Sequence, residues 1–418
     1  MKRIILVFFT VFISKVYAQV PDINFCYQKA IENYPMYKQK DILNNINELK
    51  VKSINTNYLP QVNLNGQMTY QSDVTTLPIK IPKVTIPEMS KDMYKATLDV
   101  NQLIYDGGTV KNQRTIEELG VQSDKQNLET ELYKLKERIN QLYFGVLVYQ
   151  KNIELLDISK QTIKSKLKEI ESGIRNGTIN EISSDKLNAE IINIDQKIIE
   201  LNKTKQATIK MLGELISVSI ADNTTLTIPV SLAVNESENT RPELKVFDIA
   251  KERLIASKSL LSSKLYPKLY GFGEVGYGRP GLNMLNNDFQ SFYIVGAKLS
   301  WNLWNWNQTK TDKKIIDLQA DIVSLNKDTY SKNININKQK DLAEIEKYDE
   351  LLIKDQELIM LRTKIAKTTS SQFDNGFITS SDYLNEVNAE TQAKINYEMH
   401  KIQLIKAKYD YLVNLGKL

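Results

Sequence analysis

The chain of 418 residues has little of the chemistry on which enzymes and metal proteins depend. It contains one cysteine, Cys26, and one histidine, His400. A single cysteine excludes an internal disulfide framework. A single histidine argues against a multi-histidine metal site and against a Ser-His-Asp triad. Carboxylates are numerous but form no recognisable pocket pattern, so we predict no catalytic, metal or cofactor site and no enzymatic activity.

Nucleotide-binding patterns are also missing or misplaced. No glycine-rich phosphate loop ending in Gly-Lys-Ser or Gly-Lys-Thr occurs. Gly271, Gly273 and Gly276 fit the GxGxxG spacing of dinucleotide sites, but that motif needs a helix that begins within it. Further turn residues follow here instead, so we predict that these glycines lie in a strand.

Long apolar runs are confined to the start of the chain. Lys2 and Arg3 precede an apolar stretch, and Val16-Tyr17-Ala18 provides a small-residue cleavage site, a pattern typical of a signal peptide. We therefore expect residues 1–18 to be removed and the protein to be exported. No later run approaches the ~20 apolar residues of a transmembrane helix. Cleavage removes three positive charges and lowers the formal net charge from +5 to +2, which does not support a nucleic-acid partner.

The two halves of the chain repeat each other. Tyr58-Leu59-Pro60 recurs as Leu265-Tyr266-Pro267, and Asn176-Gly177 recurs as Asn375-Gly376. Each half is expected to run strand, loop, strand, long helix, turn and second helix. The pattern predicts an internal two-fold repeat. We place the first structural repeat at 19–216, a linker at 217–240, and the second repeat at 241–418.

Four segments are predicted as strands, two in each half: about 60–71, 94–105, 268–278 and 290–302. Apolar and polar residues alternate along them, most regularly in the first segment. Period two indicates a strand with one apolar face. A strand of ~10 residues, tilted as in outer-membrane barrels, spans about 25 Å of apolar membrane. For one such strand alone a soluble β-sandwich would be the favoured interpretation, but four in an exported chain favour a membrane sheet.

All three tryptophans, Trp301, Trp304 and Trp306, gather where the fourth strand is expected to end. This position is typical of the aromatic girdle at a membrane interface. Four strands cannot close a barrel around a lumen, since the smallest membrane barrels use about eight. Open edges cannot face lipid. The sheet therefore predicts an oligomer with lipid outside and water inside.

Two helical hairpins are predicted, at about 107–216 and 307–417. Apolar residues recur at alternating steps of four and three, for example from Leu128 to Leu156. This heptad pattern is typical of helices packed side by side along their length. A pair of soluble coiled-coil hairpins would give the same heptads. We expect the linker to pack as a belt against the helices.

A group of lysines in the first hairpin is expected to lie on a solvated helix face. The group consists of Lys160, Lys164, Lys166 and Lys168.

Several local motifs occur in a characteristic order. They are Ala30 with Asn33-Tyr34-Pro35, Tyr58-Leu59-Pro60, Asp106-Gly107-Gly108, Arg241-Pro242-Glu243-Leu244 and the two Asn-Gly helix turns. In these motifs the chain resembles the TolC-like outer-membrane efflux proteins, also called outer membrane factors. The resemblance covers essentially the whole mature chain.

The resemblance implies a mixed α/β membrane protein made mostly of long α-helices. Each protomer would give four strands to a trimeric twelve-stranded β-barrel in outer-membrane lipid, continued by a twelve-helix periplasmic α-barrel. The homotrimer would be a passive exit duct of a tripartite efflux or type I secretion system. An inner-membrane pump would energise it through a periplasmic adaptor (membrane fusion protein). The alternative is a periplasmic coiled-coil structural or adaptor protein that is not inserted in the outer membrane.

The resemblance also implies a pore constriction near the second helical turn. Asp382 matches an acidic ring position of the family, and Asn385 occupies the next ring position. Ser183 is the equivalent place in the first half. An alternative role for Asp382 is to cap the returning helix.

The resemblance further implies that the tips of the two hairpins dock the adaptor. The residues concerned are those of the two turns: Asn176, Gly177, Asn375 and Gly376.

Overall fold

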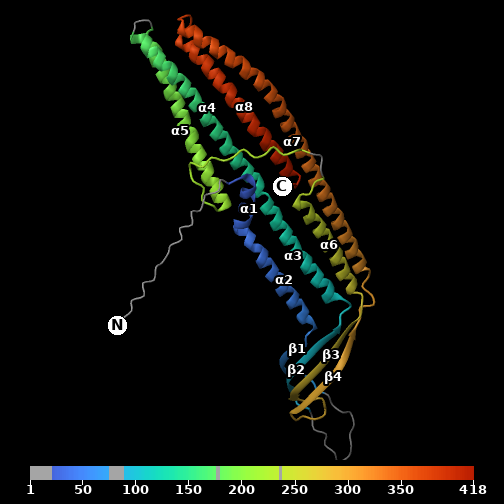
Figure 1. The fold of residues 1–418 in the computed structure, drawn as a ribbon. Helices are drawn as coiled ribbons and strands as arrows, with labels where there is room; N and C mark the ends of the chain where they lie inside the picture. Colours follow the sequence, from blue (N-terminus) through green and yellow to red (C-terminus); the bar gives the residue numbers. More distant parts are fainter. Residues whose placement is uncertain (1–20, 75–88, 176–178, 235–237) are drawn as a thin grey trace, which may run out of the picture. The chain divides into compact units, whose positions relative to one another are not determined.

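The computed structural model describes residues 21–74, 89–175, 179–234 and 238–418. The expected signal peptide, together with Asn176 and Gly177, lies outside these ranges. The chain forms helices and one four-stranded sheet (Figure 1). It divides into two compact units, each of which takes segments from both sequence halves. The sheet unit consists of the described residues of Lys38–Thr130 and Pro242–Lys332. The hairpin unit consists of those of Met1–Tyr37, Glu131–Arg241 and Asn333–Leu418.

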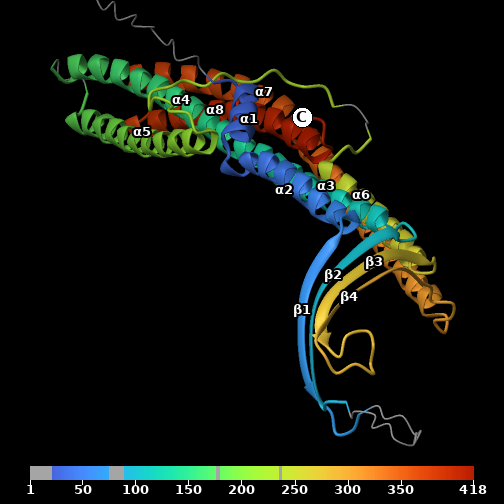
Figure 2. The same ribbon diagram turned by 90° about the horizontal axis from the view of Figure 1, so that it is seen from below.

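In the sheet unit, strands β1 to β4 form an antiparallel sheet in the order β1-β2-β3-β4. Their bounds are Gln61–Tyr70, Asp92–Tyr105, Lys268–Arg279 and Gln290–Ser300. The strands lie side by side in a curved sheet (Figure 2). The β2–β3 pairing, for example Leu98 opposite Val275, joins the two halves of the sequence. β1 and β4 each pair with one neighbour, so the single chain leaves two sheet edges.

The glycines of the GxGxxG pattern lie inside β3, as the sequence predicts. A Cβ atom at Gly276 would lie 2.3 Å from the ring of Phe292 on β4. The strand therefore needs a residue without a side chain here, because the ring fills the space. Of these glycines, Gly276 is the one that cross-strand packing requires, because a Cβ atom at Gly273 would meet nothing within 4 Å and one at Gly271 would make only ordinary contact.

Four helices complete the sheet unit: α2 (Gln39–Asn55), α3 (Thr109–Tyr133), α6 (Pro242–Ser263) and the first part of α7 (Gln308–Asp374). Polar contacts link them in this order, such as the Nζ atom of Lys258 on α6, which donates to Asp317 on α7 at 2.6 Å. No helix within the described ranges combines the length and the apolar character of a membrane-crossing helix. Neither α2 nor α6 was predicted from the sequence as a separate helix.

The Asp106-Gly107-Gly108 motif makes the junction between β2 and α3. The Asp106 carboxylate accepts hydrogen bonds from the backbone N–H groups of Gly108 at 2.9 Å and Val110 at 2.6 Å. These bonds satisfy donors that the start of a helix leaves free. Gly107 has φ +68°, and a Cβ atom there would lie 2.6 Å from Tyr266. The motif thus turns a strand into a helix within three residues.

The hairpin unit contains α1 (Ile23–Asn33), α4 (Leu135–Arg175), α5 (Glu181–Ile216), the second part of α7, and α8 (Ser380–Asn414). α1 was also not identified from the sequence. One apolar cluster holds four of the helices together, α4, α5, α7 and α8. Its buried members are Ile163, Ile170, Leu187, Ile191, Ile194, Phe373, Tyr383, Leu384 and Val387. The heptad positions of both hairpins therefore share one core near the turns.

The described part of the linker packs against the helices of the hairpin unit, as expected. The side-chain amide of Gln150 on α4 donates to the Leu226 carbonyl and accepts from the Leu226 N–H, both at 3.1 Å. The Tyr143 hydroxyl donates to the Thr227 carbonyl at 2.9 Å. At the end of the linker, the Thr240 N–H donates to the Leu415 carbonyl at 2.9 Å. The linker is thus fixed by backbone and side-chain hydrogen bonds.

Candidate functional site

One face of the sheet is apolar across all four strands. Leu64 on β1 lies opposite Leu98 on β2, which lies opposite Val275 on β3, which lies opposite Tyr293 on β4. These side chains are exposed: Leu64 is 80% and Tyr293 is 75% accessible. A continuous exposed apolar band of this kind marks a surface that water does not cover in the functional state.

The opposite face carries polar and charged side chains. The Asn65 side chain donates a hydrogen bond to the Asp99 carboxylate on β2. Lys95 on β2 forms an ion pair of 2.7 Å with Glu274 on β3. Aromatic rings enter this face in the second half, where Phe292 covers Gly276. The sheet therefore separates an apolar side from a side that suits water.

The three tryptophans lie directly after β4, where the sequence places them. The Trp301 indole N–H donates to the Leu265 carbonyl at 3.0 Å. Trp304 and Trp306 meet edge to face with ring centroids 5.9 Å apart, and Trp306 is 84% exposed. The anchored ring and the two exposed rings suit an interface, and their role as a girdle remains a prediction.

A second aromatic group, which was not predicted from the sequence, lies at the other end of the sheet. The guanidinium of Arg279 lies 5.5 Å from the ring centroids of both Tyr94 and Phe289. It also forms an ion pair with Asp92. Phe289 stacks on Tyr277 with centroids 5.6 Å apart. Strand pairing assembles this group from distant segments, so no local sequence signal could reveal it.

In the hairpin unit, the Asn375-Gly376 turn ends α7. Gly376 has φ +73°, and its N–H donates to the Phe373 carbonyl at 3.1 Å. The Phe377 N–H donates to the Gln372 carbonyl at 2.9 Å. These two bonds are those of a Schellman motif, which requires the left-handed conformation that glycine adopts without strain. Phe377 is 80% exposed, so the turn presents an aromatic ring to its surroundings.

Asp382 lies in the first turn of α8 and is exposed. Thr379 is the N-cap residue: its hydroxyl accepts from the Asp382 N–H at 3.2 Å, and the Asp382 carboxylate accepts from the Thr379 N–H at 3.0 Å. This reciprocal pair is a capping box. Hydrogen bonds from Thr379, with a smaller effect of the Lys186 charge, hold the pKa of Asp382 below its usual value. The helix-capping role is therefore present, and the constriction role remains a prediction.

The two other expected constriction residues also lie in first turns or close to them. Asn385 is exposed, one turn beyond Asp382 on α8. Ser183 is half-buried in the first turn of α5, where its N–H donates to the Asn180 carbonyl at 3.0 Å. Within the described residues of this unit, Ser183 forms no hydrogen bond or ion pair with Asp382 or Asn385. Their placement in a common ring remains a prediction.

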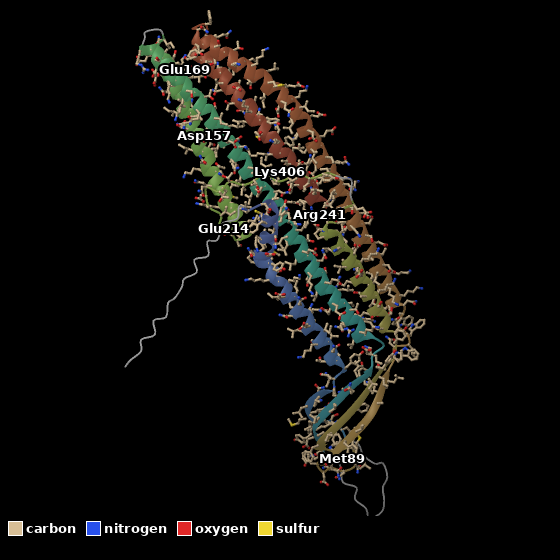
Figure 3. The ribbon with its side chains drawn as sticks, in the orientation of Figure 1. Met89, Asp157, Glu169, Glu214, Arg241 and Lys406 are labelled. Atoms are coloured by element: carbon tan, nitrogen blue, oxygen red, sulfur yellow. The ribbon has the colours of Figure 1, made fainter. Side chains whose placement is uncertain are left out.

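Two of the four lysines depart from their expected environment: Lys160 is half-buried and pairs with Asp195 on α5, and Lys166 departs further. Lys166 was expected on a solvated face, but it is only 8% exposed. Its Nζ atom donates to both carboxylate oxygens of Asp374, at 2.8 and 3.0 Å, and to Glu169 at 2.6 Å. Glu169 is on α4, towards its turn end (Figure 3). The expectation was wrong because the second hairpin packs over this side of α4.

The lone histidine is bonded to a neighbouring helix, and the lone cysteine is buried. The His400 Nδ1 atom lies 2.6 Å from the Asp355 carboxylate, which joins α8 to α7. Cys26 is fully buried, and burial raises the pKa of its thiol to about 12. Among the described residues, no three His, Cys, Asp or Glu side chains converge as metal ligands would.

Comparisons with known proteins gave one family match over part of the chain and a shared fold over most of it. Residues 27–214 match the family described as Outer membrane efflux protein. The structure is similar to three crystal structures of outer-membrane proteins. The first is VceC of Vibrio cholerae, with a TM-score of 0.68, 11% identity and coverage of 94% of this chain and 96% of VceC. The second is CmeC of Campylobacter jejuni, with a TM-score of 0.66, 13% identity and coverage of 94% of this chain and 85% of CmeC. The third is MtrE of Neisseria gonorrhoeae, with a TM-score of 0.69, 13% identity and coverage of 95% of this chain and 89% of MtrE. No curated protein sequence matches the chain. At these identities the structural likeness establishes the shared fold.

Proposed function

We propose, given that the chain belongs to the outer membrane efflux protein family and lies in the outer membrane, that three copies form one passive export channel. Each copy donates its four-stranded sheet to a twelve-stranded barrel. The helices of the three copies continue the barrel as a twelve-helix tunnel into the periplasm. The channel has no catalytic role.

The observation that carries this proposal is the sheet with one exposed apolar face and two free edges. In lipid, each unpaired backbone N–H or C=O group costs several kcal/mol. The edge of β1 in one copy and the edge of β4 in the next supply complementary antiparallel partners. Closure among copies pairs both edges, directs the apolar band to lipid, and encloses the polar face around water.

The helices of the sheet unit support the same assembly. α2 exposes apolar residues at steps of four and three, and so does the first part of α7. The α2 residues are Ile42, Ile46 and Leu49; those of α7 are Ile315, Leu318, Ile322 and Leu325. An exposed seam with this spacing needs a partner helix. α7 of one copy packing against α2 of the next would cover both seams.

We assign the helical turns to docking and the start of α8 to the pore. The exposed Phe377, beside Asn375 and Gly376, gives an adaptor an apolar contact at the tip. The adaptor connects the channel to an inner-membrane pump, which supplies the energy. Three copies of Asp382 would form a ring whose negative charge acts on passing ions. Asn385 and Ser183 line the same passage without charge.

The purified protein, reconstituted in planar lipid bilayers, tests this proposal. A channel predicts stable unitary currents and recovery of the protein only with detergent from the membrane fraction. The periplasmic coiled-coil alternative predicts a water-soluble protein without conductance, and that result would refute the proposal. A photo-crosslinking residue at Asn375 should capture an adaptor in cells, whereas the same residue at Lys197, away from the turn, should not.

A further inference from the structure

A cation from the first hairpin lies beside the expected constriction. The Nζ atom of Lys186, in the second turn of α5, donates to the Ser381 hydroxyl on α8 at 2.7 Å. Ser381 directly precedes Asp382 in the sequence. The bond therefore holds the Lys186 ammonium next to the carboxylate that we assign to the pore.

We propose that Lys186 determines the ion selectivity of the channel by compensating the charge of the Asp382 ring. This inference rests on the proposed function, because the ring exists only in the assembled channel. Three Lys186 ammonium groups offset three Asp382 carboxylates. The constriction then has no strong preference for cations, and it admits neutral and anionic solutes as well as cationic ones.

The neighbouring residues leave Lys186 as the cation best placed for this role. The capping hydrogen bonds of Thr379 keep Asp382 ionised. Asn385, one turn further along α8, has no charge that could replace it. Glu181 and Asp185 are exposed on α5, but successive residues of a helix point in different directions, and of these three α5 residues Lys186 is the one bonded to α8.

Single-channel recording with a trivalent cation tests the role of Lys186. At about 0.15 M salt, charges within ~8 Å of the ion path still act on a permeating ion. Lys186→Gln removes three positive charges from the constriction, so the half-blocking concentration of hexaamminecobalt(III) should fall by about tenfold. The cation-to-anion permeability ratio should rise. Lys186→Arg keeps the charge and should behave like the wild type.

Lys197→Gln is the matched control, because Lys197 is an exposed lysine of the same helix that pairs with Glu200 at 2.8 Å. Eleven residues of helix place it ~16 Å from Lys186, beyond the screening distance. It should leave the blockade unchanged, and Asp382→Asn should weaken the blockade. Conducting channels in which Lys186→Gln matches Lys197→Gln would overturn this inference alone. A wild-type protein without conductance would overturn the proposed function, and this inference with it.

Discussion

An arginine in the apolar band of the sheet should prevent the protein from inserting into lipid. Leu64 lies near the middle of β1, opposite Leu98 and in the row that crosses all four strands. Its side chain is 80% exposed in the single chain, so Leu64→Arg removes little packing within the protomer. In the assembled channel the same side chain would face hydrocarbon. Any loss of stability on substitution can therefore be assigned to the lipid environment and not to packing inside the protomer.

The expected cost follows from the depth of the residue. A lipid-facing arginine at the bilayer midplane of a β-barrel costs about 2–4 kcal/mol. Three copies in one barrel raise the cost to about 6–12 kcal/mol, comparable to the whole stability of a typical folded protein of about 5–15 kcal/mol. Leu64→Arg should accordingly fold into vesicles only at much lower denaturant concentration, or not at all.

The assay is urea-dependent folding into lipid vesicles, followed by tryptophan fluorescence, because all three tryptophans lie directly after β4. Asn63→Arg is the matched control. Asn63 is the preceding residue, lies on the polar face and sits opposite Asp99, so arginine there should be tolerated. Equal unfolding midpoints for Leu64→Arg and Asn63→Arg would refute the assignment of the two faces.

Three further predictions concern the hairpin unit. Lys166→Met should lower the stability of the turn ends of the two hairpins by about 1–3 kcal/mol and speed hydrogen exchange there, because Asp374 loses two charge-assisted hydrogen bonds. Lys164→Met is the control: Lys164 is exposed, so its substitution should change neither quantity. Burial raises the pKa of Asp341 in the folded protein, so its ionised form opposes folding. The protonated carboxyl favours the folded state below the unfolded-state pKa of about 3.9. This contribution is lost as the pH rises through the pKa of the folded state. Asp341→Asn should therefore raise the melting temperature at pH 7 and leave it unchanged near pH 3, and an equal effect at both would contradict the burial argument. Cys26 should resist alkylation at pH 8 in the folded protein and react after unfolding, since its thiol is buried and its pKa is about 12; rapid labelling of the native protein would show that α1 is not packed as described.

The strands could be read from the sequence because their alternation is regular, but their ends could not. The fourth strand was expected to reach residue 302, whereas β4 ends at Ser300. Ser300 pairs with Lys268, the first residue of β3, so the β3–β4 ladder ends at this pair. A strand ends where its partner ends, and an alternating pattern in one segment contains no information about the partner.

The helices show the same limit at longer range. Heptad spacing continues through Lys134, from Leu132 to Leu135, so it gave no sign that α3 and α4 are separate helices. The burial of Lys166 depends on Asp374, a residue 208 positions away that only the packing of the second hairpin brings close. The Asp382 capping box could be anticipated, because Thr379 and Asp382 have the local spacing that the motif needs. Local chemistry was readable, and contacts between distant segments were not.

The number of copies in the detergent-solubilised protein tests the central claim most directly, since a sheet with two free edges and an exposed apolar face is complete only among copies. Native mass spectrometry of the detergent complex should give three chains and no smaller stable species. A monodisperse single chain that stays folded in water without detergent would contradict the account.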